Sequence, residues 1–150
     1  MRLLIPPPIY ALVIVLLIWG VSNWFPALAL DFPGKTFVAG IMIFVGLGFD
    51  LISVRRFFTA NTTVSPLTPK KAEALVTDGL YRYSRNPMYL GLALILTGIA
   101  VWAGNWLGFL GVPLFVVLIT QFQIKPEEEI LLEKFGEPYG DYKMQVRRWI

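Results

Sequence analysis

The stretch PMYLGLALILTGIAVWAGNWLGFLGVPLFVVLITQF, residues 87–122, carries no charged side chain and decides the fold class. Its apolar character pauses at Ala103-Gly104-Asn105, which predicts two helices joined by a tight turn. Each arm is shorter than the roughly 20 residues of a typical membrane span. We therefore expect a membrane hairpin whose arms are tilted or packed closely on other helices through their small residues: Gly91, Gly98, Gly108 and Gly111.

Two further apolar segments precede this hairpin, at residues 9–25 and 36–51. The prolines at positions 6–8 mark the entry to the first segment, because proline cannot continue a helix. The short link Asp31-Phe32-Pro33-Gly34 predicts that the two segments form an antiparallel pair. Close helix contact is expected at the small residues of the second segment: Gly40, Gly46 and Gly48.

A secretory signal is the alternative interpretation of residues 9–25. Only Arg2 supplies a basic region before the apolar run, and Ser22-Asn23-Trp24-Phe25 is a poor cleavage site. We therefore interpret the segment as the first membrane helix.

The composition agrees with a membrane protein of one domain. Of the 150 residues 56% are hydrophobic and 15% charged, and the mean hydropathy is +0.63. The expected fold is all-α and polytopic, with about four transmembrane helices plus cytoplasmic C-terminal helices. Residues 1–58 form the N-terminal helical pair of this domain, and residues 59–150 form its second half.

Cysteine and histidine are both absent from the sequence. Their absence excludes disulfides, thiol nucleophiles, imidazole acid–base catalysis and the usual zinc ligands, so no metal site is predicted. The net charge of +3 is not gathered in a basic run. We therefore expect no nucleic-acid partner.

The basic residues predict how the spans are oriented. Lys35 alone lies in a link on one side, whereas the central loop and the tail carry most of the positive charge. By the positive-inside rule the loop, the tail and the N-terminus face the cytoplasm. The expected location is the inner membrane of a prokaryote. The residues that set this orientation are Arg55, Arg56, Lys70, Lys71, Arg82 and Arg85 in the loop, and Lys125, Lys134, Lys143, Arg147 and Arg148 in the tail.

The tail is predicted to form two further helices. The first begins after Pro126 with Glu127-Glu128-Glu129, because carboxylates favour a helix N-terminus, and Gly136 ends it. A second helix then carries an aromatic face at three- and four-residue spacing, which predicts a helix at the membrane surface. Its aromatic residues are interpreted as interfacial anchors: Tyr139, Tyr142 and Trp149.

Three ordered motifs resemble the isoprenylcysteine carboxyl methyltransferase and phospholipid methyltransferase superfamily. Leu75 to Tyr81 is similar to the family's Leu-Val-Thr-x-Gly-x-Tyr stretch, and Arg85 to Tyr89 is similar to its Arg-His-Pro-x-Tyr motif. Glu128-Glu129 through Phe135-Gly136, Tyr139, Tyr142 and Val146 is similar to the family's Glu-Glu followed by Phe-Gly-x-x-Tyr-x-x-Tyr. The resemblance begins at about Glu73, and the N-terminal pair matches only in character.

The resemblance implies that S-adenosylmethionine binds between the central loop and the tail. The cofactor-binding residues predicted from the motifs are Leu75, Val76, Tyr81, Arg85, Asn86, Pro87, Met88, Tyr89 and Glu128. Tyrosine rings and a carboxylate suit the cofactor's adenine and its cations, while Arg82 or Arg85 would meet its carboxylate. Methyl transfer requires chiefly alignment of the reactants, and no catalytic residue is predicted.

Two departures from the family pattern concern the acceptor. Asn86 stands where the prenylcysteine enzymes have histidine, and it can still donate and accept hydrogen bonds. Those enzymes also place a substrate-contacting arginine where this chain has Gln123, Ile124 and Lys125. A prenylcysteine carboxylate is therefore disfavoured as the acceptor. The sequence does not otherwise decide whether the methyl group goes to a carboxylate, an amine or a thiol.

Asp50 is the acid nearest to an apolar span. An intramembrane carboxylate suggests function, but an ion pair with Arg55 or a position at the headgroups explains it equally well, so it is left out of the predicted site.

The sequence thus predicts an S-adenosylmethionine-dependent methyltransferase acting on a lipid or other lipophilic small molecule in the membrane. A membrane reductase using NADPH and a non-catalytic membrane scaffold of the same fold are the alternatives. The oligomeric state is left open.

Overall fold

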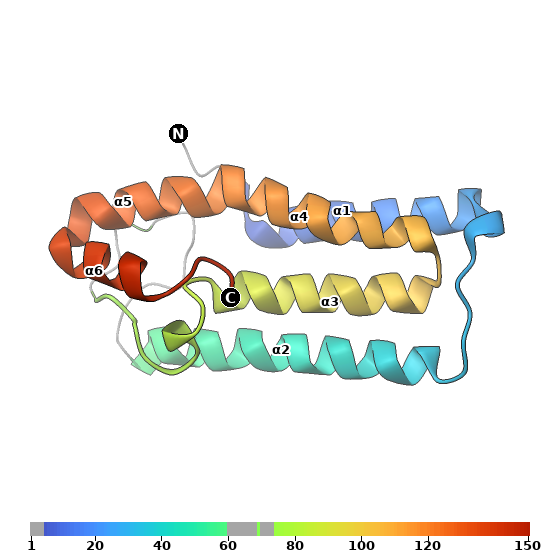
Figure 1. Cartoon of the computed structure of the whole chain (residues 1–150), viewed down its shortest axis with the longest axis horizontal. Helices are drawn as coiled ribbons and strands as arrows, with labels where there is room; N and C mark the ends of the chain where they lie inside the picture. Colours follow the sequence, from blue (N-terminus) through green and yellow to red (C-terminus); the bar gives the residue numbers. More distant parts are fainter. Residues whose placement is uncertain (1–4, 60–68, 70–73) are drawn as a thin grey trace.

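The computed structural model describes residues 5–59, 69 and 74–150, and it is helical with no strand in these ranges beyond one isolated bridge. The all-α prediction is confirmed (Figure 1). The α-helices are α1 (Pro7–Trp24), α2 (Lys35–Thr59), α3 (Pro87–Ala103), α4 (Gly111–Ile119), α5 (Lys125–Phe135) and α6 (Glu137–Gln145). The shorter turns are η1 (Pro26–Leu28), η3 (Gly79–Arg82), η4 (Trp106–Leu110) and the π-helical η5 (Thr120–Ile124).

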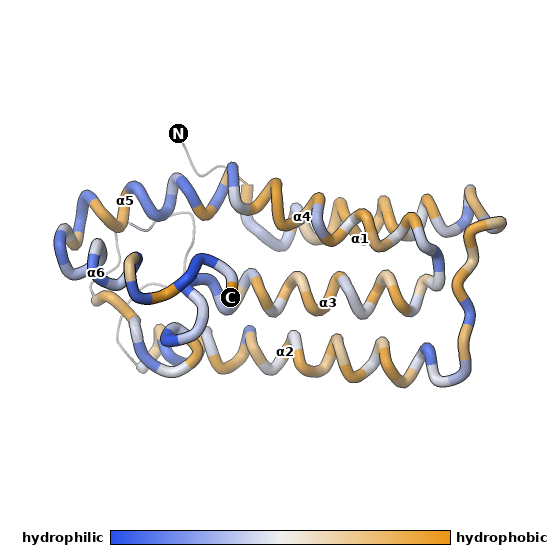
Figure 2. Tube along the Cα trace, in the orientation of Figure 1, coloured by the Kyte–Doolittle hydropathy of each residue, from blue (hydrophilic) through white to orange (hydrophobic). Residues whose placement is uncertain are grey.

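The long helices have the length and composition of membrane spans. Three described helical stretches, 7–24, 35–59 and 106–135, are long and apolar enough to cross a bilayer, and α3 is a shorter apolar helix of 17 residues. Large apolar side chains such as Phe37 and Phe44 point outward from α2. Figure 2 shows this apolar character along α1 to α4, with hydrophilic residues gathered toward α5 and α6. The chain is a polytopic membrane protein.

The fourth span differs from the prediction, because it does not end before the acidic turn. Helix runs without interruption from η4 through α4, η5 and α5, so Pro126 starts no separate helix. Proline removes one N–H and crowds the preceding turn. The π turn directly before it absorbs that disruption: the Lys125 N–H bonds to the Thr120 carbonyl, five residues back.

The entry to α1 also differs slightly from the prediction. Pro7 and Pro8 belong to the first turn of the helix instead of preceding it. Proline is tolerated there because the N–H groups of a first turn have no partner within the helix.

Helices α2 and α3 pack along each other through glycine. A Cβ atom built on Gly46 would lie 2.6 Å from the Gly91 carbonyl oxygen, and one on Gly98 would lie 2.9 Å from the Ala39 carbonyl oxygen. The two backbones therefore approach more closely than any side chain would permit. The expectation holds for Gly46 but is wrong for Gly40 and Gly48, whose Cβ positions face open space.

The other side of α3 packs on α1 and α4. Buried apolar side chains from the three helices form the core of the bundle, namely Ile14, Ile18, Leu96, Ala100, Phe115 and Ile119. The expected close contacts of Gly108 and Gly111 are confirmed, because both lie against side chains of α1. Helix α3 is thus the central element, with α2 on one side and the α1–α4 pair on the other (Figure 1).

At one end of the bundle, hydrogen bonds join the link between α1 and α2 to the link between α3 and α4. Ala29 and Asn105 form the isolated bridge, and the Leu30 N–H donates to the Gly104 carbonyl at 2.7 Å. The Asn105 amide also donates to the Phe25 carbonyl at 2.8 Å. These bonds pair backbone groups of the two links that no helix satisfies.

The other end gathers the described part of the central loop and the tail, as the sequence predicted. The Arg85 N–H donates to the Arg147 carbonyl at 3.0 Å, so loop and tail are in direct contact. The second tail helix is shorter than expected, because α6 ends at Gln145 and residues 146–150 run back toward the start of α3 (Figure 1). Lys70 and Lys71, two of the predicted orientation residues, lie outside the described residues.

Replacing Gly91 by alanine is expected to separate α2 from α3. The new methyl group would overlap the Gly46 carbonyl oxygen and the Asp50 carboxylate, and overpacking of this kind costs roughly 1–3 kcal/mol. Thermal unfolding of the purified protein in detergent would show a lower Tm. Gly48→Ala on α2 is the matched control, because it meets nothing, and an equal Tm for Gly91→Ala and Gly48→Ala would contradict the packing argument.

Candidate functional site

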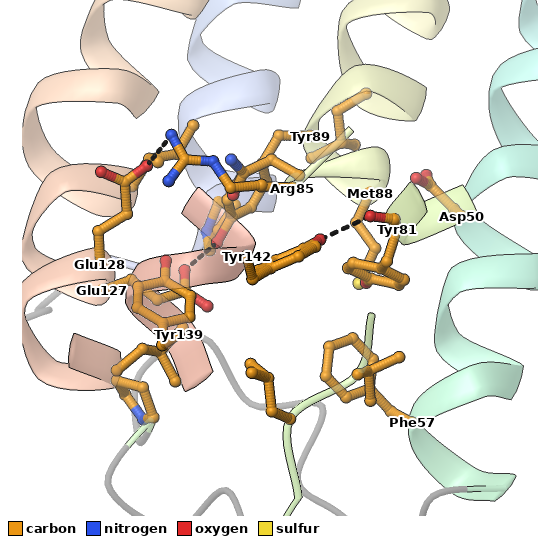
Figure 3. A pocket seen from close by; sticks show the side chains of 18 of the residues that line it. Asp50, Phe57, Tyr81, Arg85, Met88, Tyr89, Glu127, Glu128, Tyr139 and Tyr142 are labelled. Carbon is orange, nitrogen blue, oxygen red and sulfur yellow. Dashed lines mark hydrogen bonds and ion pairs between the residues drawn. The ribbon is translucent and has the colours of Figure 1, made fainter. Parts of the chain in front are cut away.

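A cavity of about 360 Å³ lies where the central loop and the tail meet the bundle. Its walls come from the start of α1, the second half of α2, the loop around η3, the first turns of α3, and α5 and α6 (Figure 3). Ligand pockets of this size accommodate small organic molecules. The cavity therefore draws on nearly every element at this end of the protein.

Eight of the nine residues predicted to bind cofactor line the cavity. They are Leu75, Val76, Tyr81, Arg85, Asn86, Met88, Tyr89 and Glu128. Pro87 is buried at the first position of α3 and is not part of the lining. Its fixed φ suits that first position, so its role in the structure is to start the helix.

Glu128 is the electrostatic centre of the site. Its carboxylate accepts two hydrogen bonds from the Arg148 guanidinium, at 2.9 and 2.8 Å, and pairs with Arg85 at 3.2 Å. Lys143 lies 3.9 Å away. The hydrogen bonds to Glu128 raise the pKa of Arg148 above its ordinary value. One carboxylate thus joins α5, α6, the loop and the tail.

Arg85 lines the cavity and has unused hydrogen-bonding capacity. Only 9% of its side chain is exposed, yet its Nε and Nη1 atoms have no hydrogen-bond partner. Buried donors are normally satisfied, so unpaired ones in a cavity point to a ligand. Of the two arginines that the sequence left as alternatives, Arg85 lines the cavity, whereas Arg82 is exposed and outside the lining.

The tail is fastened to the start of α3 by backbone carbonyls. The Asn86 amide donates to the Arg148 carbonyl at 3.0 Å, and the Ser84 hydroxyl approaches the same oxygen at 3.4 Å. Asn86, which stands where the prenylcysteine enzymes have histidine, therefore holds the tail in place. These contacts fix the position of the tail relative to the first turn of α3, beside the cavity.

Glu127 also lines the cavity, whereas the sequence analysis interpreted it only as part of a helix start and left it out of the predicted site. It accepts a hydrogen bond from the Tyr89 hydroxyl at 3.0 Å. The error follows from the assumed helix break at Pro126. On one continuous helix, Ile124, Glu127, Glu128 and Leu131 recur at three- and four-residue spacing and share a face, a signal that the sequence contained.

Tyr139 and Tyr142 are buried cavity residues, so their interpretation as interfacial anchors is wrong. They are 3% and 8% exposed, and the Tyr142 hydroxyl donates to the Tyr81 carbonyl at 2.7 Å. Burial raises the pKa of both phenols, which keeps them protonated. The physical reason is Gly136, whose φ of +62° reverses the chain and turns α6 back toward the loop.

Trp149 is partly buried and packs on the core of the bundle. Its indole N–H donates to the Thr120 hydroxyl in η5 at 3.2 Å. It therefore anchors the tail to the π turn.

Asp50 lines the cavity from the side of α2. No ion pair joins it to Arg55 in the described residues, so that explanation of the carboxylate is wrong. Nearby, Arg56 pairs with Asp78 at 3.1 Å, and the rings of Phe57 and Tyr81 meet edge to face with centroids 5.5 Å apart. The described residues contain no cluster of three His, Cys, Asp or Glu side chains suited to a metal.

These features define a helical membrane protein with an aromatic, charged cavity at one end of its bundle. The sequence model of the family described as "Phospholipid methyltransferase" matches residues 35–138, more than half of the chain. The chain therefore belongs to the phospholipid methyltransferase family.

Individual relatives agree with this family. A protein-S-isoprenylcysteine O-methyltransferase of Schizosaccharomyces pombe is 30% identical over 128 residues, which cover 81% of this chain and 52% of the relative. Methanethiol S-methyltransferase 1 of Bradyrhizobium diazoefficiens is 27% identical over 131 residues, 86% of this chain and 44% of the relative. An uncharacterized protein of Haemophilus influenzae is 52% identical over 63 residues, 42% of this chain and all of the relative. The chain spans about half the length of the two named methyltransferases.

Replacing Glu128 by glutamine is expected to loosen the tail. The substitution removes the negative charge shared by Arg85, Arg148 and Lys143, and hydrogen bonds to a charged group contribute roughly 1.5–3 kcal/mol. A lower Tm and faster proteolysis of the tail would report the loss. Glu129→Gln, at an exposed neighbouring position, should leave both unchanged. Equal behaviour of the two variants would show that the ion cluster does not hold the tail.

Proposed function

We propose that this protein is an S-adenosylmethionine-dependent methyltransferase that methylates a lipophilic acceptor in the membrane. The observation that carries the proposal is the buried guanidinium of Arg85, with two unpaired nitrogen atoms, in the wall of a cavity of about 360 Å³. Family membership supports the same activity, because the matched residues 35–138 include the motif residues that line this cavity. In this proposal residues 1–150 act as one catalytic domain.

The residues of the cavity fit the cofactor. Arg85 lines the cavity, and a guanidinium is the group that suits a carboxylate. Glu127 and Glu128 lie on the same side and suit an ammonium group (Figure 3). When bound, S-adenosylmethionine supplies an activated methyl group on a sulfonium. The other predicted residues, Leu75, Val76, Met88 and Tyr81, line the remaining wall, where apolar and aromatic surface suits an adenosine.

The protein's own contribution to the reaction is binding and orientation. Burial raises the pKa of Tyr81, so its phenol stays neutral in the cavity. Tyr89 and Glu127 are fixed by their mutual hydrogen bond, and Tyr142 holds the Tyr81 backbone in place. A preorganised cavity can align two reactants without a dedicated acid or base.

The proposed acceptor enters from the membrane. Ile124, which is 1% exposed, lines the cavity, while Lys125 points outward and donates to Gln121 at 2.8 Å. The position at which the prenylcysteine enzymes carry an arginine therefore presents an apolar surface here. This favours a lipophilic acceptor in which the methylated group is not a carboxylate. By the positive-inside rule the cavity faces the cytoplasm, in the inner membrane of a prokaryote.

Binding of S-adenosylhomocysteine to the purified protein tests the cofactor site. Titration calorimetry should give a saturable isotherm that Arg85→Gln weakens by roughly 2–3 kcal/mol, because the guanidinium meets the ligand's carboxylate. Arg82→Gln is the matched control and should bind as the unmodified protein does. Absence of binding, or binding of NADPH in place of S-adenosylhomocysteine, would contradict the proposal and favour a reductase.

Methyl transfer itself is tested with a labelled cofactor. Incubating the protein with methyl-labelled S-adenosylmethionine and extracted membrane lipids should yield a labelled, organic-soluble product, and Arg85→Gln should abolish it. The product's mass spectrum would identify the acceptor atom. Cofactor binding with no labelled product from any lipid or lipophilic fraction would instead indicate a non-catalytic scaffold.

A further inference from the structure

The end of the tail contacts the last long helix at two points. Arg148 and Trp149 are neighbours in the sequence. The Arg148 guanidinium donates to the Glu128 carboxylate at 2.9 and 2.8 Å. The Trp149 indole N–H donates to the Thr120 hydroxyl at 3.2 Å. The helical segment between these two contacts contains the whole π turn η5.

The π turn brings the two contact points to nearly the same face of the helix. Thr120 and Glu128 are eight residues apart in the sequence, and at about 100° per residue a regular helix would direct them about 80° apart. A π turn takes up one additional residue, so the rotation between them equals that of about seven residues, which leaves them about 20° apart. The tail can therefore bind both residues from one side, whereas a regular helix would turn one of them away.

The tail is held in place by contacts that do not involve this helix. The Arg85 N–H donates to the Arg147 carbonyl at 3.0 Å, and the Asn86 amide donates to the Arg148 carbonyl at 3.0 Å. The Trp149 ring packs on the core of the bundle. The start of α3 and the core thus support the tail where it binds the π turn.

Thr120 is the residue at which the π turn and the tail meet. Its carbonyl accepts the Lys125 N–H, the bond that defines the π turn, and its hydroxyl accepts the Trp149 N–H. π turns are rare and occur frequently at functional sites, because they interrupt the regular bonding of a helix. A contact that favours this conformation therefore has a consequence for the residues beyond it.

We infer that Trp149 is a positioning residue: its hydrogen bond to Thr120 holds the π turn, and the π turn directs Glu127 and Glu128 toward the cavity. Trp149 does not line the cavity itself, so it acts on a ligand only through this helix (Figure 3). The inference rests on the proposed function, in which these two carboxylates suit the ammonium group of the cofactor.

Binding of S-adenosylhomocysteine to matched variants tests the inference. Trp149→Phe keeps an aromatic ring but removes the N–H, and Thr120→Val removes the hydroxyl at similar size. Each should weaken binding roughly fivefold, the effect expected of one neutral hydrogen bond. The double variant should bind no more weakly than either single variant, because both remove the same bond.

Two further variants are the controls for this binding experiment. Thr120→Ser retains the hydroxyl and should bind S-adenosylhomocysteine as the unmodified protein does. Trp102→Phe changes a tryptophan that is 61% exposed on α3 and outside the cavity lining, and it should also leave binding unchanged.

A readout without ligand reports the direction of the helix beyond the π turn. The sequence contains no cysteine, so a single one can be placed at Leu131, which lines the cavity, or at Leu132, which is 43% exposed. A maleimide should label Leu132→Cys faster than Leu131→Cys. Without the π turn, residue 131 would take the direction that residue 132 has now, so Trp149→Phe should narrow the difference between the two rates.

Equal affinity of Trp149→Phe and the unmodified protein for S-adenosylhomocysteine would overturn the inference even with a lower Tm, because a purely structural contact changes stability alone. Additive losses in the double variant, or an unchanged difference in labelling rates, would also overturn it. Thr120→Val removes the bond from the other side, so the test does not depend on the folding of Trp149→Phe. If S-adenosylhomocysteine binds to none of the proteins, methyl transfer is refuted, and the labelling rates alone decide the role of Trp149.

Discussion

The site depends on the carboxylate of Glu128. It is held by Arg148 from the tail and by Arg85 from the loop, with Lys143 of α6 close by. Because the Glu128 side chain is only 8% exposed, its charge would be unfavourable without these cations. Three segments that are distant in sequence are brought together by this requirement, and the cavity is the space that they enclose with the bundle.

The bundle beneath the cavity follows a different constraint. An apolar phase offers no partner for free backbone groups, so residues 87–103 and 106–135 are helical almost throughout. In the residues that the structure describes, non-helical backbone is confined to the ends, where Leu30 bonds to Gly104 at one end and Arg85 bonds to Arg147 at the other. The polar residues of the cavity are therefore located at the end of the bundle where the central loop and the tail meet.

The sequence predicted the elements that depend on local pattern. Apolar length predicted the spans, glycine at position 91 predicted a close helix contact, and ordered motifs predicted Arg85 and Glu128 as neighbours in one pocket. The errors concern features that depend on tertiary structure. Tyr139 has the same spacing whether α6 lies on a membrane or under a loop, and the reversal at Gly136 decides between them. Asp50 could not be assigned because its surroundings come from α3, forty residues later in the chain.

The π turn at Thr120–Ile124 controls the rotational phase between the membrane part of the last long helix and its extension. An α-helix advances about 100° per residue, so a turn that closes over five residues instead of four rotates everything beyond it by a fraction of a circle. Glu127 and Glu128 face the cavity with this phase, and a regular helix would direct the same two carboxylates elsewhere. The π turn therefore lets α4 direct one face to the lipid while α5 directs a different face to the cavity. The residues of the two faces can change independently of each other.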